Sequence, residues 1–156
     1  GDLDNRIAKP LNQTLLDSSL DNNPLCKQTT NTSTIMAAEE VAKAFVAHFY
    51  QCFDSDPNQL ANLFTGESMM TFEGQQFQGP QAIVDKLKGV GKVSHQIKST
   101  DVQPSSNASA ILIFVTGGIS IDGGNPLHYC EMFQLVSTGP GAYYVHNCIF
   151  RLNYGL

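Results

Sequence analysis

Acid–base chemistry could rest on only a few side chains of this sequence: His95, Asp101 and one of two tyrosines, Tyr50 or Tyr129. Proton transfer needs such a group together with a partner that orients it. His95 lies two residues from an apolar residue on either side, so on a strand it would share their face and point inward. A single histidine on an apolar face is more often a hydrogen-bonded core residue than a catalyst. Nothing in the sequence resembles a Ser-His-Asp set, a phosphate loop or a metal site, so the sequence favours binding over catalysis.

The cysteines carry no metal or redox signature either. Cys26, Cys52, Cys130 and Cys148 form no CxxC pair, and no metal-binding motif includes them. Buried thiols in a reducing compartment explain such a set best. We therefore expect neither a metal centre nor a disulfide framework.

The chain is acidic, with 14 aspartates and glutamates against 9 lysines and arginines and a formal net charge of −5. This deficit of basic residues leaves no electrostatic footprint for a phosphate backbone, so nucleic acid is not an expected partner. An acidic surface attracts basic protein surfaces instead. No apolar run approaches the roughly 20 residues of a membrane span, and the N-terminus lacks the apolar stretch of a signal peptide. We expect a soluble intracellular protein without a membrane partner.

Residues 1–35 differ in composition from the rest of the chain. They are rich in Asn, Asp, Ser and Thr and contain no aromatic residue. Such a segment buries too little apolar surface to offset the entropy that is lost on ordering. We therefore divide the chain into a polar N-terminal extension, 1–35, and a domain, 36–156. The extension is expected to be flexible or non-native, as vector-derived residues, an upstream translation or a lineage-specific tail.

The domain begins with helical patterns. From Met36 to Pro57, apolar residues recur at spacings of three and four, which places them on one face of a helix. A short second helix is expected over 59–64. A small hairpin over 69–77 then leads to a third helix over 81–88, which a Gly-Pro pair opens.

After the third helix the pattern changes to a period of two. It predicts four long strands, at 93–103, 108–121, 128–137 and 142–152, joined by turn-rich segments. Strands that follow one another through short turns pair antiparallel. Helices first and strands afterwards indicate the α+β class, with three helices on one face of a mainly antiparallel sheet. The glycine pair at 117–118 indicates that this sheet is strongly bent.

Several separated motifs of the domain resemble the nuclear transport factor 2 family. The resemblance extends from about residue 36 to residue 156, and the motifs occur in the order that the family has. Chance is a poor explanation for such a series. The matching segments are 41–46 (VAKAFV), 70–79 (MTFEGQQFQG), 82–87 (AIVDKL), 101–104 (DVQP) and 149–154 (IFRLNY).

The resemblance implies a homodimer of cone-shaped α+β domains of the NTF2-like fold. Members of the family carry the GDP-bound form of the small GTPase Ran into the nucleus. They pass through nuclear pores by binding the phenylalanine-glycine repeats of nucleoporins, so they occur in the cytoplasm, the nucleus and the pore. They use no cofactor and catalyse nothing. Because the same cone also houses other functions, a scaffold or adaptor module and a small-molecule isomerase or dehydratase remain as alternatives.

The resemblance places the Ran-binding charges at two acidic residues. Glu73 lies inside the longest motif, where the family uses a carboxylate to pair with basic residues of the GTPase. Asp122 is the second, although a turn-starting aspartate would explain it equally well. The family carries another acid two positions later, where this chain has Gly124. This departure predicts weaker binding of a standard Ran or a different partner.

Between these acids the family has an apolar cavity that takes an aromatic side chain of the GTPase. For the positions of this chain that match the cavity, which are given below, plain core packing is the alternative to a role in binding. The segment 89–91 is two residues shorter than in the family, which predicts that part of one cavity wall is missing, with Val90 as a partial substitute. The matching positions are Phe72, Ile119, Ile121, Leu127 and Tyr129.

Two further surfaces follow from the resemblance. Asp54 matches a residue that the family uses for nucleoporin binding, and a helix-end cap is the alternative role for it. We expect the repeats in an apolar groove near the first helix. Ile149 and Arg151, on one face of the last strand, match the surface through which such domains dimerise.

Overall fold

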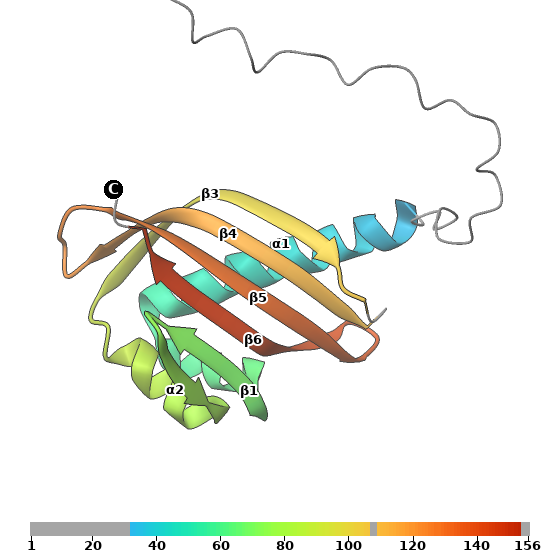
Figure 1. Ribbon diagram of the computed structural model, residues 1–156, viewed down its shortest axis with the longest axis horizontal. Helices are drawn as coiled ribbons and strands as arrows, with labels where there is room; N and C mark the ends of the chain where they lie inside the picture. Colours follow the sequence, from blue (N-terminus) through green and yellow to red (C-terminus); the bar gives the residue numbers. More distant parts are fainter. Residues whose placement is uncertain (1–31, 107–108, 154–156) are drawn as a thin grey trace, which may run out of the picture. The chain divides into compact units, whose positions relative to one another are not determined.

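Three helical segments and one six-stranded sheet make up the described part of the chain, residues 32–106 and 109–153 of the computed structural model (Figure 1). The α+β class and the NTF2-like arrangement predicted from the sequence are confirmed. The prediction of an extension at 1–35 falls largely on residues 1–31, which lie outside the described residues, as does Cys26. The elements are α1 (Thr32–Ser55), η2 (Pro57–Leu63), β1 (Phe64–Phe72), β2 (Gln75–Gln78), α2 (Gly79–Lys88), β3 (Val93–Pro104), β4 (Ala110–Ile121), β5 (Leu127–Gly139) and β6 (Ala142–Leu152).

The first helix is longer than its pattern predicted. It begins at Thr32, four residues before Met36, and ends at Ser55. Its inward face carries apolar side chains at helical spacing, of which Ala42 and Phe49 are fully buried. The helix ends where Asp56, which has extended φ and ψ, caps the next segment through the backbone N–H of Asn58. That next segment, η2, is the short second helix that the sequence predicted over 59–64; it is a 3-10 helix and covers Pro57–Leu63.

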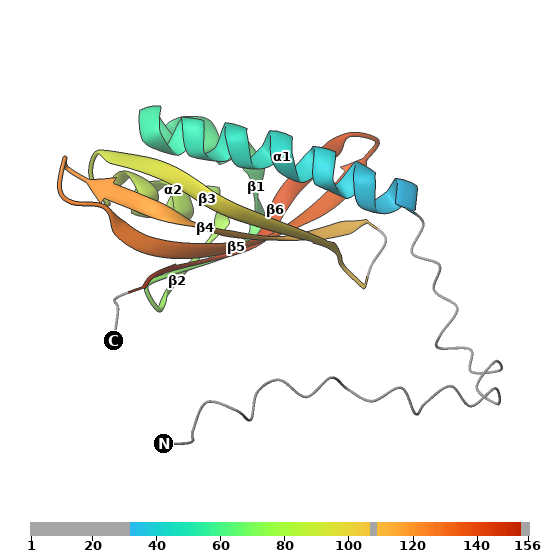
Figure 2. The same cartoon turned by 90° about the horizontal axis from the view of Figure 1, so that it is seen from above.

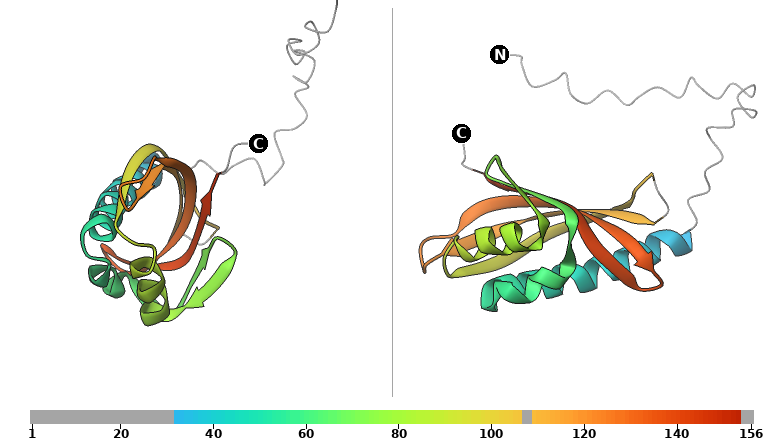
Figure 3. Two further views of the ribbon diagram at one scale, coloured as in Figure 1. Left: turned by 90° about the vertical axis from the view of Figure 1, so that its left-hand side faces the viewer. Right: turned by 90° about the horizontal axis from the view of Figure 1, so that it is seen from below.

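The sheet has the strand order β2-β1-β6-β5-β4-β3. The last four strands of the chain pair antiparallel with their neighbours in sequence, as expected. The hairpin of β1 and β2 joins the same sheet, because β1 lies parallel to β6. The sheet curls around the helices, and α1 lies against its concave side (Figures 2 and 3). In this strand order, β2 and β3 are the two edge strands of the sheet.

Aromatic rings fill the space between α1 and the concave face of the sheet. Phe49 packs edge-on against Phe133 of β5, with ring centroids 4.8 Å apart, and Phe45 packs on the same ring at 5.0 Å. Such edge-to-face pairs add to the stability that area burial provides. This cluster fixes α1 across the sheet, and with it the position of every side chain that α1 presents to β3.

Candidate functional site

The two acidic residues predicted for partner binding share an uncommon backbone conformation. Glu73 has a φ of 49° and Asp122 a φ of 50°, and each precedes a glycine with positive φ. The left-handed region costs energy for a residue with a Cβ, and such strain gathers at functional sites. The β1–β2 turn and the β4–β5 turn, which hold these two residues, lie at one end of the sheet (Figure 1). Glu73 adjoins the end of β6, and Asp122 directly follows β4 next to the start of β5.

Each carboxylate also holds its own turn in place. Oε1 of Glu73 accepts the backbone N–H of Leu152 at 2.5 Å. Oδ1 of Asp122 accepts the backbone N–H of Lys92 at 2.9 Å. An ionised carboxylate has about four acceptor positions, so one such bond leaves capacity for a basic group of a partner. The arrangement presents two oriented negative charges at the same end of the molecule.

The short segment 89–91 packs directly on one of these acids. A Cβ on Gly91, whose φ is +106°, would lie 2.8 Å from Oδ1 of Asp122. Only glycine therefore allows this close approach. Val90 packs against the core as a partly buried residue. This is the position at which the shorter segment was predicted to leave the cavity wall incomplete.

The predicted cavity residues lie at this same end, but most of them are interior. Phe72 stacks on Phe150 with ring centroids 4.4 Å apart, and Phe150 stacks on Tyr129 at 5.4 Å. Ile119 is fully buried. The accessible part of this set is Leu127, 39% exposed, together with the half-buried Ile121.

A lysine covers the outer end of this ring column. The ammonium of Lys86, on α2, lies 4.9 Å from the centroid of the Phe72 ring and 5.7 Å from that of Phe77. A cation over a ring face is attracted to it by electrostatics. The predicted cavity is thus bordered by one basic group in addition to the two acids.

His95 is a hydrogen-bonded core residue, which is the role that the sequence favoured for a single histidine on an apolar face. Its Nδ1 lies 2.5 Å from Oδ1 of Asp54, and its backbone N–H donates to Oδ2 of the same carboxylate at 2.9 Å. Burial lowers the pKa of His95, and the Asp54 carboxylate acts in the opposite direction. The exposed Asp101 is not among its partners in these bonds. Of the candidate acid–base residues, the structure brings His95 together with Tyr50 and Tyr129, whose ring centroids lie 4.8 Å and 5.3 Å from that of the histidine. The carboxylate that bonds to the imidazole is that of Asp54 and not that of Asp101.

The sequence analysis missed a buried carboxyl on β5. Glu131 is only 1% exposed, and it accepts hydrogen bonds from the hydroxyl of Tyr50 at 2.7 Å and from Sγ of Cys148 at 3.1 Å. Burial raises its pKa to about 7, against the two hydrogen bonds, which lower it. An acid at an inward position of an alternating apolar strand, between Tyr129 and Phe133, was the signal that could have revealed it.

The convex face of the sheet carries an apolar row. Phe114 of β4 is paired with Met132 of β5, which is paired with Ile149 of β6. Phe114 is 43% exposed and Ile149 42% exposed. Arg151, two residues further along β6, lies over Gly74, with Nη2 3.4 Å from the position that a Cβ would take there.

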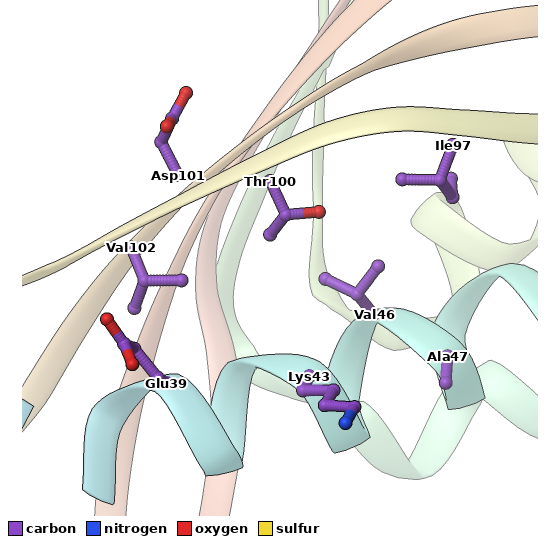
Figure 4. A pocket seen from close by; sticks show the side chains of 8 residues that line it. All are labelled: Glu39, Lys43, Val46, Ala47, Ile97, Thr100, Asp101 and Val102. Carbon is purple, nitrogen blue, oxygen red and sulfur yellow. The ribbon is translucent and has the colours of Figure 1, made fainter. Parts of the chain in front are cut away.

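A groove of about 580 Å³ lies between α1 and the edge strand β3 (Figure 4), and we call it the α1–β3 groove. In Figure 4 the side chains of Ile97, Thr100 and Val102 point from β3 toward α1, whereas Asp101 points away from the helix. The residues that line the α1–β3 groove are Glu39, Lys43, Val46 and Ala47 from α1 and Ile97, Thr100, Asp101 and Val102 from β3.

Other kinds of site find little support in residues 32–106 and 109–153. Within these ranges no three His, Cys, Asp or Glu side chains gather where they could hold a metal ion. None of the helices described there has the length and apolar character that crossing a membrane requires. Cys52, Cys130 and Cys148 are free thiols.

Comparison with known proteins gives a consistent result. The family model of the nuclear transport factor 2 (NTF2) domain matches residues 41–152. Nuclear transport factor 2B of Arabidopsis thaliana is 45% identical over 122 residues, which cover 76% of this chain and 97% of that protein. Nuclear transport factor 2 of Oryza sativa subsp. japonica is 45% identical over 123 residues, 77% of this chain and 100% of the relative. The solved structure of nuclear transport factor 2 from Cryptosporidium parvum superposes with a TM-score of 0.69 at 38% identity, covering 74% of this chain and 94% of that one.

Proposed function

The chain belongs to the nuclear transport factor 2 family, and we propose that it carries GDP-bound Ran into the nucleus by binding both Ran and the phenylalanine-glycine repeats of nucleoporins. The relatives are named as transport factors and not as enzymes, which agrees with a nuclear transport role without catalysis. The identity extends over nearly the whole length of these relatives. The protein would then act in the cytoplasm, the nucleus and the pore.

The observation that carries the Ran assignment is the pair of acids in left-handed turns. Glu73 and Asp122 keep this strained conformation although glycine or asparagine would adopt it at lower cost. Their carboxylates would receive basic side chains of the GTPase in charge-assisted hydrogen bonds. An aromatic side chain of the partner would enter beside Ile121 and Leu127, the accessible members of the cavity set, over the buried Phe72, Ile119 and Tyr129.

The homodimer belongs to the same proposal. The row of Phe114, Met132 and Ile149 leaves apolar side chains on the convex face of the sheet, where a twofold partner would cover them. Arg151 lies next to this row on β6 and would contribute at its margin. In such a dimer, the end of each protomer that carries Glu73 and Asp122 would remain free to bind Ran.

For nucleoporin binding, the structure supports an indirect role of Asp54. Both of its carboxylate oxygens are bonded to His95, so it ties the end of α1 to β3. These two elements are the walls of the α1–β3 groove. Asp54 would therefore serve the nucleoporin site by positioning its walls.

Binding to Ran loaded with GDP and, separately, with GTP tests the proposal. We expect binding to the GDP form only, and its loss in Glu73→Lys, which reverses one of the two charges. Glu67→Lys is the matched control, because Glu67 is an exposed acid on β1 away from the turn. Equal binding of both nucleotide forms, or full binding by Glu73→Lys, would contradict the assignment.

A further inference from the structure

Two polar atoms in the interior, on neighbouring rings of β3 and β5, have no hydrogen-bond partner among the described residues. They are Nε2 of His95 and the hydroxyl oxygen of Tyr129, and only one other buried side-chain nitrogen or oxygen in residues 32–106 and 109–153 shares this property. The His95 side chain is 1% exposed and Tyr129 is 2% exposed. Their ring centroids lie 5.3 Å apart. Buried polar groups in folded proteins nearly always have a partner, so two neighbouring exceptions indicate one that they share.

The packing of the two rings holds both atoms in place. The Tyr129 ring stacks on Phe150 on one side. On another side it lies against the backbone of Gly117, where a Cβ would be 2.9 Å from Cε1 of the tyrosine. His95 is fixed by its two bonds to the carboxylate of Asp54. Because interiors are close-packed, neither ring can turn toward a different partner without losing these contacts.

Asp54 decides which hydrogen-bonding role the second ring nitrogen of His95 has. An ionised carboxylate only accepts, so Nδ1 of His95 donates its proton to Oδ1 of Asp54. Burial lowers the pKa of His95 and so favours the neutral ring, although Asp54 acts in the opposite direction. In a neutral imidazole with its proton on Nδ1, Nε2 is an acceptor. His95 therefore needs a hydrogen-bond donor at Nε2.

The surrounding groups select a small, uncharged ligand that both donates and accepts. The hydroxyl of Tyr129 can give and receive a hydrogen bond, but it does not bond directly to Nε2 of His95. The hydroxyl of Tyr50 donates its proton to Glu131, so its oxygen can only accept a further bond. The rings of Tyr50 and Phe53 lie 4.8 Å and 4.9 Å from the imidazole, between centroids, and close the space around it.

We propose that one water molecule is bound in the interior between His95 and Tyr129, where it donates to Nε2 of the histidine and accepts from the hydroxyl of the tyrosine. Its second proton is left for the oxygen of Tyr50. Buried waters typically make about three such bonds and are part of the folded structure. This water joins β3 to β5 across β4, and it extends the link between Asp54 and His95 from α1 to the middle of the sheet. The site does not depend on the proposed transport function.

A high-resolution crystal structure of the full chain tests the site directly. We expect an ordered oxygen within about 3.2 Å of both Nε2 of His95 and the hydroxyl of Tyr129. In Tyr129→Phe, which keeps the ring and removes the hydroxyl, this oxygen should be lost. Tyr144→Phe is the matched control, because the half-buried Tyr144 packs on His146 instead, and it should retain the oxygen. No oxygen in the parent, a direct bond between the two side chains, or an oxygen that stays in Tyr129→Phe would overturn the proposal.

Nitrogen-15 NMR tests the hydrogen-bond roles in solution and without a substitution. Couplings between the carbon-bound ring protons of His95 and its two nitrogens show which nitrogen carries the proton. We expect the proton on Nδ1 and an unprotonated Nε2 at neutral pH. Oxygen-17 relaxation dispersion should also count one long-lived internal water fewer in Tyr129→Phe than in the parent and in Tyr144→Phe. A proton on Nε2, or the same number of internal waters in all three proteins, would contradict the site.

Discussion

Replacement of the buried Glu131 by glutamine should stabilise the fold at neutral and alkaline pH. Glu131 is fully enclosed, and its two hydrogen-bond donors, Tyr50 and Cys148, are uncharged at neutral pH. The ionised form of the parent carboxylate is therefore paired with no basic group in these contacts. Glutamine has nearly the same shape, can still accept from the tyrosine hydroxyl, and carries no charge at any pH.

The magnitude follows from the pKa of the carboxyl. Burial raises the pKa of Glu131 from 4.5 to about 7, so the folded protein binds a proton that the unfolded chain releases between these pH values. The free energy of unfolding therefore falls as pH rises from 4.5 to 7 and is constant, as far as this group is concerned, above 7. At about 1.4 kcal/mol per pH unit, the difference between the two pKa values amounts to roughly 3 kcal/mol.

Urea denaturation at pH 5 and pH 8, at one protein concentration, measures this effect. The free energy of unfolding of the parent should fall between the two pH values by up to roughly 3 kcal/mol more than that of Glu131→Gln. His95, whose pKa burial lowers, titrates in both proteins and cancels in the comparison. Glu67→Gln, at an exposed acid, should behave like the parent. The same pH dependence in the parent and in Glu131→Gln would refute the reasoning.

Three further changes test other parts of the account. Gly124 lacks positive φ, and a Cβ there would lie 3.1 Å from the carbonyl oxygen of Ile121, so Gly124→Asp should fold after a small adjustment. The added carboxylate should make the variant bind GDP-bound Ran several-fold more tightly, most clearly at low salt. Weaker binding in an anisotropy titration would count against a carboxylate clamp. Ile149→Glu places a charge in the apolar row and should sediment as a monomer, whereas a dimer would show that the interface lies elsewhere. Asp54→Ala leaves two N–H donors of His95 without their acceptor and should lower the free energy of unfolding by about 1–3 kcal/mol in urea denaturation. It should also weaken the binding of a repeat peptide, and unchanged stability would mean that the link between α1 and β3 is unimportant.

Much of the fold could be predicted because its elements are amphipathic. The periods of 3.6 and 2 mark where a helix or strand has one buried face, and α1, α2 and β3 to β6 follow them closely. The parallel pairing of β1 with β6 could not be predicted, since it joins segments about 80 residues apart and leaves no local pattern. The first three residues of α1, Thr32 to Thr34, are polar, so nothing in the periodicity indicated that the helix begins there.

The site was predicted less completely than the fold. The Asp-Gly pair at Asp122 is a turn signal, and the structure has a turn there. Glutamate before a glycine is a weaker signal, and the left-handed conformation of Glu73 depends on the strand ends around it. Glu131 was missed because a strand pattern reports which face is inward but not which polar groups meet there. Its partners Tyr50 and Cys148 come from α1 and β6, and only the packed sheet brings them together.

Nuclear accumulation of labelled, GDP-bound Ran in permeabilised cells depleted of soluble factors tests the central claim most directly. The account predicts that adding this protein restores accumulation, that Glu73→Lys fails to restore it, and that Glu67→Lys restores it fully. Restoration by Glu73→Lys, or no accumulation with the parent protein although it folds and dimerises, would contradict the transport function.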